Sequence, residues 1–456
     1  MYKQKTKKVM DLLNGSIWDK ILMFALPLAA SSILQQLFNS ADVAVVGQFA
    51  GSRALAAVGS NGAVINLLVN IFVGLSVGAN VVIARCLGEG NKQRIRDAVH
   101  TSVLVALVSG FFVMIVGITV TRPILTLMST PDDIIDLAVV YLRIYFLGMP
   151  FIMLYNFGAA ILRSKGDTKR PFLCLLASGI INVLLNLFFV IVCGLSVAGV
   201  GMATVISNAI SSGMILYFLT HEKSEIRLSL RNLKIDKRIL KEITRIGLPA
   251  GLQGMVFSFS NICVQSALNS LGSDAVAGSA AALNFEYFVY FLLNSFTQAC
   301  VTFTSQNYGA NKYDRCKKIA LISFGMGLAF STVLSLIFYF LGENALRFYT
   351  SEPKVIEIGI VRMQYCLLMQ FISVAMDVLS GSMRGFGYSM IPALISLLGS
   401  CGFRLLWVYL VFPLSPTFVT LVSVYPISWM ITSGAMLIAF LIVCKRVSKK
   451  MVLSGV

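Results

Sequence analysis

Long apolar segments follow one another along the whole chain, and no other feature limits the possible folds as strongly. A helical residue rises about 1.5 Å, so a helix that crosses a membrane needs about 20 mostly apolar residues. The sequence predicts twelve such segments, at residues 20–46, 54–84, 98–121, 134–157, 171–193, 197–219, 240–268, 276–305, 316–341, 355–380, 388–412 and 416–443. Of the 456 residues, 57% are hydrophobic and only 12% are charged. We therefore predict an all-α polytopic protein with twelve transmembrane helices, whose solvent is largely the lipid bilayer.

The net charge of +17 raises the question of a nucleic-acid partner, but its distribution favours a membrane protein. The basic residues gather in alternate loops, as they do on the cytoplasmic side of membrane proteins. These segments are "KQKTKK", "RCLGEGNKQRIR", "RSKGDTKR", residues 223–245, "NKYDRCKK" and the tail "KRVSKK", whereas the other loops read "STPDD", "GSD" and "TSEPK". We expect both termini in the cytoplasm, a multi-pass protein of a bacterial plasma membrane, no nucleic-acid partner, and no cleavable signal peptide because the first apolar segment is too long for one.

The two halves of the chain resemble each other at intervals of about 221 residues. The matching pairs are "ALP" (25–27) with "GLP" (247–249), "GEGNK" (88–92) with "YGANK" (308–312), "LRSKGDTKRP" (162–171) with "MRGFGYSMIP" (383–392), and "ISNAISSG" (206–213) with "ISWMITSG" (427–434). Each half holds an even number of spans, so the repeats are related by a pseudo-two-fold axis along the membrane normal. We predict two six-helix bundles, 1–220 and 241–456, joined by a cytoplasmic linker at 221–240. Such parallel repeats occur in transporters, although a duplication can also be purely structural.

Three polar side chains, Gln35, Asn39 and Asp42, share one face of the first predicted span. An ionisable group in hydrocarbon costs at least ~2.5 kcal/mol on insertion scales and therefore usually faces a cavity or a partner. Asp42 also lies about one turn from the outer end of its span, so a carboxylate exposed to water at the interface is the alternative. The stripe beneath Asp42 favours a functional site, because an interfacial acid needs no polar face.

The fifth and sixth spans carry similar stripes. They comprise Ser178, Asn182 and Asn186 in one span and Thr204, Asn208 and Ser211 in the next. Together with Asp42 they would make a polar cavity in the first half, able to exchange a proton or to hold a small cation on oxygen ligands. Serine and threonine in spans often bond only to their own helix backbone, which weakens that part of the prediction.

The second half has its own polar stripes. They are Glu286, Tyr290 and Asn294 in the eighth span, Gln370, Ser373 and Asp377 in the tenth, and Asn261 with Gln265 in the seventh. Carboxylates among aromatic rings suit an amphipathic organic cation, through charge pairing and ring contacts. Asp377 has an alternative, a pair with Arg384 two turns along. Arg404 is the expected buried partner of either Glu286 or Asp377.

Other kinds of chemistry find no support in the sequence. Nine scattered cysteines show no CxxC spacing, and we interpret them as small apolar packing residues. Two histidines, His100 and His221, make no metal site by themselves, and no Walker, HExxH or paired aspartate motif marks an enzyme. We expect no cofactor apart from a coupling ion, and no catalytic residue.

These residues resemble the multidrug and toxic compound extrusion (MATE) family over nearly the whole chain. The likeness rests on six plus six spans, "LP" early in spans one and seven, the element Asp42-x-x-x-Val46-Gly47, and "LRSKGDTKRP" after span four. It implies two six-helix bundles and export of amphipathic cationic drugs in exchange for H⁺ or Na⁺.

The resemblance also implies roles for single residues. The family's first-helix aspartate falls on Asp42, its fifth-span asparagine on Asn182 and its sixth-span threonine on Thr204. Where many members carry a second aspartate, this chain has Asn186, which leaves the coupling ion and its stoichiometry open. A seventh-span glutamate of some relatives falls on Phe257, and Glu286 is a candidate to compensate for it.

The resulting hypothesis is a monomeric alternating-access antiporter. Asp42, Asn39, Asn182, Asn186 and Thr204 would couple a cation, H⁺ or Na⁺. The cargo, a small organic cation, would meet a second set of residues: Gln35, Glu286, Tyr290, Asn294, Gln370 and Asp377. Three alternatives stay open: a flippase for lipid-linked saccharides, a membrane-embedded enzyme and a channel. The first is disfavoured because the intramembrane charges read as mainly acidic.

Overall fold

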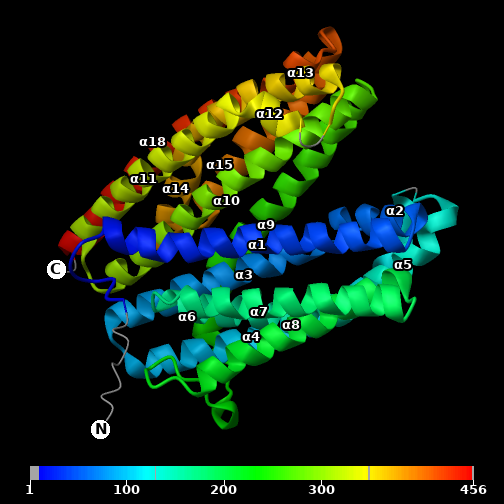
Figure 1. The fold of residues 1–456 in the computed structure, drawn as a ribbon. Coiled ribbons are helices and arrows are strands. Elements are labelled where there is room, and N and C mark those ends of the chain that lie inside the picture. The colour runs from blue at the N-terminus through cyan, green and yellow to red at the C-terminus, as the bar shows by residue number, and fades with distance from the viewer. Residues whose placement is uncertain (1–9, 129, 348–349, 454–456) are drawn as a thin grey trace, which may run out of the picture. The chain divides into compact units, whose positions relative to one another are not determined.

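The computed structural model describes residues 10–128, 130–347 and 350–453, and throughout these ranges the ordered elements are helices (Figure 1). No β-strand occurs in the described residues. The predicted cytoplasmic segment "KQKTKK" lies outside them. An all-helical protein is what the sequence predicts, because lipid offers no partner for backbone N–H and C=O groups and a helix satisfies these groups internally.

The described residues of the first half of the chain form eight α-helices. Their bounds are α1 (Trp18–Phe49), α2 (Ser52–Ser60), α3 (Gly62–Glu89), α4 (Lys92–Leu127), α5 (Asp132–Leu147), α6 (Met149–Ser164), α7 (Lys169–Leu187) and α8 (Ser196–Thr220). A π-helical turn, η1 (Phe188–Val192), extends α7, and a 3₁₀ turn, η2 (Leu230–Asn232), lies in the segment that follows α8.

The second half is more interrupted. Its α-helices are α9 (Lys237–Asn269), α10 (Ser273–Gly309), α11 (Tyr313–Phe340), α12 (Gly342–Arg347), α13 (Pro353–Arg362), α14 (Ser373–Gly385), α15 (Met390–Ser396), α16 (Phe403–Leu406), α17 (Phe418–Val422) and α18 (Val424–Leu453). Short π and 3₁₀ segments join several of them into longer rods, namely η3 (Met363–Leu367), η4 (Leu368–Ile372), η5 (Leu397–Gly402), η6 (Trp407–Val411) and η7 (Phe412–Leu414).

Among the described residues, ten helices are long and apolar enough to cross a membrane, and the bent pair α5–α6 makes an eleventh. The remaining predicted span, 240–268, coincides with α9, which is not among these ten or eleven. The helix forms where it was predicted. Its polar and small residues lower its mean hydropathy, so its composition alone does not identify it as a span.

Two predicted spans are not single straight helices. The span predicted at 54–84 is divided into α2 and α3 at Asn61, whose Nδ2 donates to the carbonyl oxygen of Ala138 at 3.3 Å. The span predicted at 134–157 bends by 46° between α5 and α6, where Gly148 separates them and Pro150 follows. Proline lacks an N–H group for the helical ladder, so a bend next to it has a local cause.

The chain divides into two compact units. Unit 1 holds residues 1–65, 76–244 and 305–312, and unit 2 holds residues 66–75, 245–304 and 313–456. In unit 1, α7 packs against both α1 and α8, and α4 packs against α5 and α6; in unit 2, α14 packs against α11 and α18 (Figure 1). Each unit thus takes a short piece from the other half of the sequence. The contiguous bundles 1–220 and 241–456 stay a prediction.

A close helix crossing within unit 1 carries the internal symmetry. A Cβ atom on Gly88 would lie 1.9 Å from the carbonyl oxygen of Gln306, and one on Gly309 would lie 2.2 Å from the carbonyl oxygen of Arg85. These four positions form two pairs that are each separated by 221 residues, the interval of the sequence repeat. The α3 and α10 backbones therefore meet in reciprocal contacts, as a pseudo-two-fold axis requires.

Unit 2 has a comparable crossing that also depends on glycine. A Cβ atom on Gly74 would lie 2.2 Å from the backbone nitrogen of Gly251, and one on Gly247 would lie 2.5 Å from the Cα of Leu75. Gly247 and Gly251 are one helical turn apart on α9, the spacing with which small residues let membrane helices approach closely.

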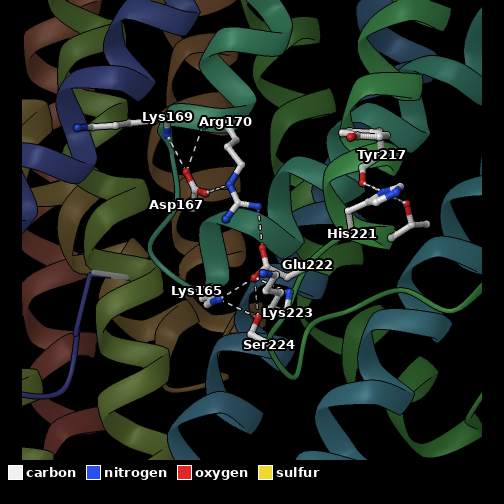
Figure 2. Close-up of polar contacts among 10 residues, drawn as sticks. Lys165, Asp167, Lys169, Arg170, Tyr217, His221, Glu222, Lys223 and Ser224 are labelled. Atoms are coloured by element: carbon white, nitrogen blue, oxygen red, sulfur yellow. Dashed lines mark hydrogen bonds and ion pairs between the residues drawn. The ribbon is translucent and has the colours of Figure 1, made fainter. Parts of the chain in front are cut away.

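The motif "LRSKGDTKRP" forms the connection between α6 and α7. Asp167 Oδ1 accepts hydrogen bonds from the backbone N–H groups of Lys169 and Arg170, both at 3.1 Å, and so satisfies two N–H groups in the first turn of α7. Figure 2 shows Lys165 and Arg170 converging on Glu222, just beyond α8, with Nζ–Oε1 and Nη1–Oε2 distances of 3.2 and 2.6 Å. The motif thus ties the α6–α7 connection to the end of α8.

The Glu222 carboxylate is the centre of this cluster. Partial burial acts to raise the pKa of Glu222, but the hydrogen bond from Arg170 and the charge and hydrogen bond of Lys165 outweigh burial and lower the pKa to about 2. The carboxylate therefore stays ionised at neutral pH and is stabilised by two cations at once.

Candidate functional site

Asp42 lies on α1 with its side chain turned into unit 1. The residue is 9% exposed, and the Nδ2 group of Asn186 on α7 donates a hydrogen bond to its Oδ1. Among the described residues, no lysine or arginine forms an ion pair with Asp42. A buried carboxylate needs hydrogen bonds or a counter-charge. Asp42 has the hydrogen bond, and no basic side chain of the described residues supplies a counter-charge.

The amide that contacts Asp42 belongs to a longer polar chain. Asn186 Nδ2 also donates to Asn182 Oδ1 at 3.2 Å, and Asn182 Nδ2 donates to Ser207 Oγ at 3.4 Å. The chain runs from α1 through one face of α7 to α8, because Asn182 and Asn186 are one turn apart and both are buried. Two of the predicted coupling residues, Asn182 and Asn186, are therefore brought together with Asp42.

Two tyrosines complete the surroundings of Asp42. Tyr141 and Tyr145 on α5 both interact electrostatically with Asp42, and their ring centroids are 6.2 Å apart. Sequence reasoning missed them. The signal was available, since Tyr141 and Tyr145 lie one turn apart within a predicted span and so share a face.

One buried acceptor of this site has no hydrogen-bond donor among the described residues. The Oδ1 atom of Asn186 is buried and accepts no hydrogen bond from the described residues. A buried acceptor without a donor costs about 1–3 kcal/mol. A rotation of the Asn186 amide by half a turn would exchange its donor and its acceptor, so that Oδ1 could accept a hydrogen bond from the O–H group of a neutral Asp42. One amide can thus stabilise both protonation states of the same carboxyl group.

Three further residues predicted to surround Asp42 are placed differently. Gln35 and Asn39 are exposed on α1, and no hydrogen bond joins either of them to Asp42. Thr204 is half-buried on α8 and donates to the carbonyl oxygen of Val200 at 2.9 Å, within its own helix. This is the bond within its own helix that weakened the prediction for Thr204, and the roles proposed for Thr204, Gln35 and Asn39 stay predictions.

In unit 2, Glu286 has a specific partner that the sequence did not suggest. Arg362 binds it in a bidentate manner, with Nε–Oε1 and Nη2–Oε2 distances of 2.7 and 2.9 Å. The side chains are 6% and 12% exposed, and Ser279 Oγ accepts a further bond from Arg362 Nη1 at 2.7 Å. The expectation that Arg404 pairs with Glu286 is wrong, because the planar guanidinium of Arg362 already occupies both carboxylate oxygens.

Asp377 also lacks an ion pair with Arg404. It is half-buried on α14, and it interacts electrostatically with Arg384 and with Tyr290 on α10. Arg384 itself donates from Nη2 to Gln253 Oε1 at 2.5 Å. The expected neighbourhood of Arg384 and Asp377 is therefore present, but the side-chain hydrogen bond of Arg384 goes to the Gln253 amide, and Asp377 forms no ion pair within the described residues.

Gln370, Tyr290 and Asn294, three of the other predicted cargo residues, lie in unit 2 together with these two acids. Gln370 is buried and donates to the backbone oxygen of Glu286 at 3.4 Å, while its own Oε1 accepts no bond from the described residues. Asn294 is half-buried, one turn beyond Tyr290 on α10. Tyr290 is 45% exposed, which leaves its ring accessible.

The charge balance inside the spans corrects one expectation. The acids Asp42, Glu286 and Asp377 are matched in number by Arg362, Arg384 and Arg404, which all lie in apolar spans of unit 2. The statement that the intramembrane charges are mainly acidic is therefore wrong for unit 2. Arg362 was the missed residue, and its position within the predicted span 355–380 was the signal that could have found it.

No group of three or more His, Cys, Asp or Glu side chains that could hold a metal ion occurs in the part of the chain that the structure describes. Most of the cysteines are buried and none of the nine forms a disulfide among the described residues.

Comparison with known proteins identifies the family. A family model, MatE, matches residues 27–188 and 249–410, once in each half and together more than half of the chain. The probable multidrug resistance protein YoeA of Bacillus subtilis (strain 168) is 29% identical over 396 residues, which are 85% of each chain. The probable multidrug resistance protein NorM of Thermotoga maritima is 25% identical over 389 residues, 83% of this chain and 82% of that one.

A solved structure shows the same fold. The crystal structure of MATE in complex with MaL6 superposes with a TM-score of 0.90 at 21% identity, over 97% of this chain and 100% of the other. The family match, the curated relatives and the shared all-helical fold agree with the resemblance drawn from the sequence. The chain therefore belongs to the MatE family, and it is a multi-pass membrane transporter of the MATE type rather than an enzyme.

Proposed function

We propose that this protein is an antiporter that exports amphipathic organic cations by alternating access, and that Asp42 is the residue at which the coupling cation and the export cycle meet. The single observation that carries the proposal is that Asp42 is buried in a span, accepts a hydrogen bond from Asn186 and pairs with no cationic side chain among the described residues. A mobile cation is the natural counter-charge for such a group.

The surroundings of Asp42 favour a proton over sodium as that cation. A hard metal cation is held by several oxygen ligands at once. Here Asn186 presents its N–H group to Asp42, and Asn182 Oδ1 is already occupied by the same N–H group. A proton on the Asp42 carboxyl group needs only one hydrogen-bond acceptor. The Oδ1 atom of Asn186, the residue that already contacts Asp42, accepts no other hydrogen bond from the described residues.

Coupling then follows from differential binding. A cation can shift the equilibrium between two conformations only by the difference in its affinity for them. Neutralising Asp42 changes the preferred orientation of the Asn186 amide, and with it the contact between α1 and α7. The membrane potential supplies about 2.3 kcal/mol per charge per 100 mV, in addition to any concentration gradient.

The cargo is an organic cation on this proposal. The relatives YoeA and NorM are probable multidrug resistance proteins, and unit 2 offers an accessible aromatic ring, Tyr290, that interacts with the acid Asp377. Ring contact and charge pairing together recognise amphipathic cations. The flippase alternative is not favoured, because these relatives are named for multidrug resistance.

The setting of the transporter is also part of the proposal. The alternation of basic and acidic loops supports cytoplasmic termini in a bacterial plasma membrane. Figure 2 places one of the basic clusters, Lys165 and Arg170, on the side where α6 ends and α7 begins. We take the functional unit to be a monomer, since each candidate residue of the Asp42 site comes from unit 1 of a single chain.

Transport into proteoliposomes separates the possible coupling ions. The purified protein is reconstituted with tetramethylrhodamine methyl ester as the organic cation, and a pH gradient or a sodium gradient is imposed in separate experiments. We expect dye movement with the pH gradient and none with sodium alone. Equal movement without any gradient-linked counter-ion would mean a channel, and movement driven by sodium alone would contradict the assignment of the proton.

A further inference from the structure

The most unusual charge in the described chain is Arg404, on α16 in unit 2. Arg404 is 3% exposed, and it lies within the apolar span that runs from Met390 to Leu414. Fourteen residues separate it from Met390 and ten from Leu414, or about 21 and 15 Å at 1.5 Å per residue. A cation at this depth is expensive and usually has a functional reason.

The partners of Arg404 are all neutral. Nε donates to Ser428 Oγ at 3.2 Å and Nη1 donates to Asn261 Oδ1 at 3.3 Å. The guanidinium carbon also lies 4.6 Å from the ring centroid of Tyr425 and 5.9 Å from that of Phe257. Within residues 10–128, 130–347 and 350–453, Nη2 donates to no acceptor and no carboxylate forms an ion pair with Arg404.

The neighbouring arginine explains why no carboxylate is left. Tyr425 packs against both guanidinium groups, since the one of Arg362 lies 5.4 Å from the same ring centroid. The acid of this cluster, Glu286, is bound by Arg362 through both of its oxygens. The cluster therefore contains two buried guanidinium groups and one carboxylate, and that carboxylate is bound by Arg362. Arg404 is left without a negatively charged partner among the described residues.

Nη1 and Nη2 form the edge of Arg404 that has no charged partner among the described residues, and the acceptor at this edge is Asn261. Asn261 on α9 is exposed, and its bond to Nη1 is long. If the Asn261 side chain turns away, Nη1 and Nη2 present the parallel pair of donors that binds a carboxylate in a bidentate manner. Ser428 would keep Nε in place, and Tyr425 would hold the plane of the guanidinium.

We propose that Arg404 binds a carboxylate group of the cargo and is the residue by which this transporter distinguishes amphipathic cations that carry a carboxylate from those that do not. The inference rests on the proposed export of organic cations and adds a second recognition element to it. A cargo group fits better than a lipid headgroup, because the phosphates of the bilayer lie at its surfaces and Arg404 lies far inside its span.

A matched pair of dyes isolates this carboxylate. Tetramethylrhodamine is a zwitterion, and its methyl ester is the same cation without the negative charge. Binding of both dyes to the protein in phosphatidylcholine nanodiscs is measured by fluorescence anisotropy, with no ion gradient, for the wild type, Arg404→Gln and Arg404→Lys. An exposed arginine of the same unit, Arg347, provides the matched control Arg347→Gln.

We expect Arg404→Gln to weaken binding of the free acid about tenfold, the equivalent of one strong hydrogen-bonded charge pair, and to leave the ester unchanged. Arg404→Lys keeps the positive charge but lacks the two parallel N–H donors, so it should lose less affinity for the free acid than Arg404→Gln. Arg347→Gln should bind both dyes like the wild type. Equal losses for the two dyes, or no loss for either, would overturn the proposal by making Arg404 a structural residue.

Two further comparisons distinguish a misfolded variant and a bound lipid from binding of the cargo. If Arg404→Gln does not yield folded protein, the ratio of the two affinities in Arg404→Lys decides in the same way. If phosphatidylglycerol in the nanodisc competes with the free acid in the wild type but not in Arg404→Gln, the oxyanion belongs to a lipid and the cargo assignment is overturned. Because binding is measured without a gradient, a failure of proton coupling at Asp42 would leave these results unaffected.

Discussion

The side-chain amide of Asn186 donates a hydrogen bond to the carboxylate of Asp42, and this contact joins α7 to α1 inside unit 1. An amide at position 186 gives the site one titratable group and one neutral partner. An aspartate there would give two carboxylates in contact, which cannot both be ionised at low cost. On the proposed coupling by protons, the identity of residue 186 therefore sets how many protons the site can exchange.

The first prediction concerns that identity. Asn186→Asp should add a proton-binding group, so that dye efflux from proteoliposomes reaches half its maximum at a higher pH than in the wild type. Asn186→Ala removes the donor without adding a charge, and it should slow efflux without that displacement. The full pH profile of efflux for the three proteins is the measurement. Superimposable profiles for Asn186→Asp and the wild type would mean that residue 186 takes no part in coupling.

The second prediction treats the Glu286–Arg362 pair as structural. Glu286→Gln leaves Arg362 buried without its counter-charge, which should cost about 3–5 kcal/mol of folding free energy. The exposed pair of Glu343 and Arg347 offers a control, because Glu343→Gln at 60% side-chain exposure should change stability by less than about 1 kcal/mol.

Replacing both partners extends this test. The double variant Glu286→Leu/Arg362→Met removes the charge and its partner together, and it should recover most of the melting temperature lost in Glu286→Gln. Thermal unfolding in detergent gives both numbers. If Glu286→Gln melts like the wild type but loses affinity for organic cations, Glu286 serves the cargo and the structural assignment fails.

The third prediction concerns the glycine crossing of α3 and α9 in unit 2. In Gly251→Ala the new Cβ would meet the backbone oxygen of Ile71 at 2.3 Å, whereas in Gly254→Ala it would lie 3.6 Å from Asn70, at ordinary contact distance. Overpacking of this kind costs about 1–3 kcal/mol or more. Gly251→Ala should therefore lower the melting temperature while Gly254→Ala leaves it nearly unchanged. A melting temperature of Gly251→Ala equal to that of the wild type would show that the two backbones do not need this close approach.

The fourth prediction is a pH dependence outside the spans. The pKa of Glu222 is about 2 in the folded protein against 4.5 ordinarily, so its stabilising contribution is full above about pH 4.5 and is lost as the pH falls toward 2. Glu222→Gln should lower stability by about 1.5–3 kcal/mol at neutral pH, the range for hydrogen bonds to charged groups. The difference from the wild type should shrink steadily below pH 4.5.

Unfolding of the detergent-solubilised protein across this pH range measures the effect. Glu225→Gln is the matched control three residues along, because Glu225 and Lys92 are 3.8 Å apart with side chains 41% and 72% exposed. It should change stability little at any pH. A stability difference for Glu222→Gln that persists at pH 2 would exclude ionisation of Glu222 as its source.

The fold could be predicted from the sequence because lipid imposes a simple rule on it. Long apolar runs must be helices, and the 221-residue repeat fixes how the halves relate. The same interval reappears in the contacts of Gly88 with Gln306 and of Gly309 with Arg85. The break at Asn61 could not be predicted in this way, since it lies inside an apolar run and Asn61 bonds to the distant residue Ala138. The bend at Gly148 has a local cause in Pro150, which hydrophobic periodicity does not reveal.

The candidate site was only partly predictable for a related reason. A stripe on one helix shows which residues share a face, so Asn182 and Asn186 were found together. It does not show which helix that face meets. The partner of Glu286 was therefore assigned to Arg404, although Arg362 binds it. Asn39 was placed with Asp42 by spacing alone, yet Asn39 is exposed and Asp42 is buried, since spacing shows a shared face and not which part of that face other helices cover.

The most direct test of the central claim measures protons at Asp42 itself. Purified protein in weakly buffered detergent is mixed with tetramethylrhodamine methyl ester, and proton release is followed with a pH indicator for the wild type, Asp42→Asn and the exposed control Asp314→Asn. We expect the wild type and Asp314→Asn to release protons as the cation binds, and Asp42→Asn to bind the dye with no release while remaining folded. Proton release from Asp42→Asn equal to that of the wild type would contradict the assignment of Asp42 as the coupling residue.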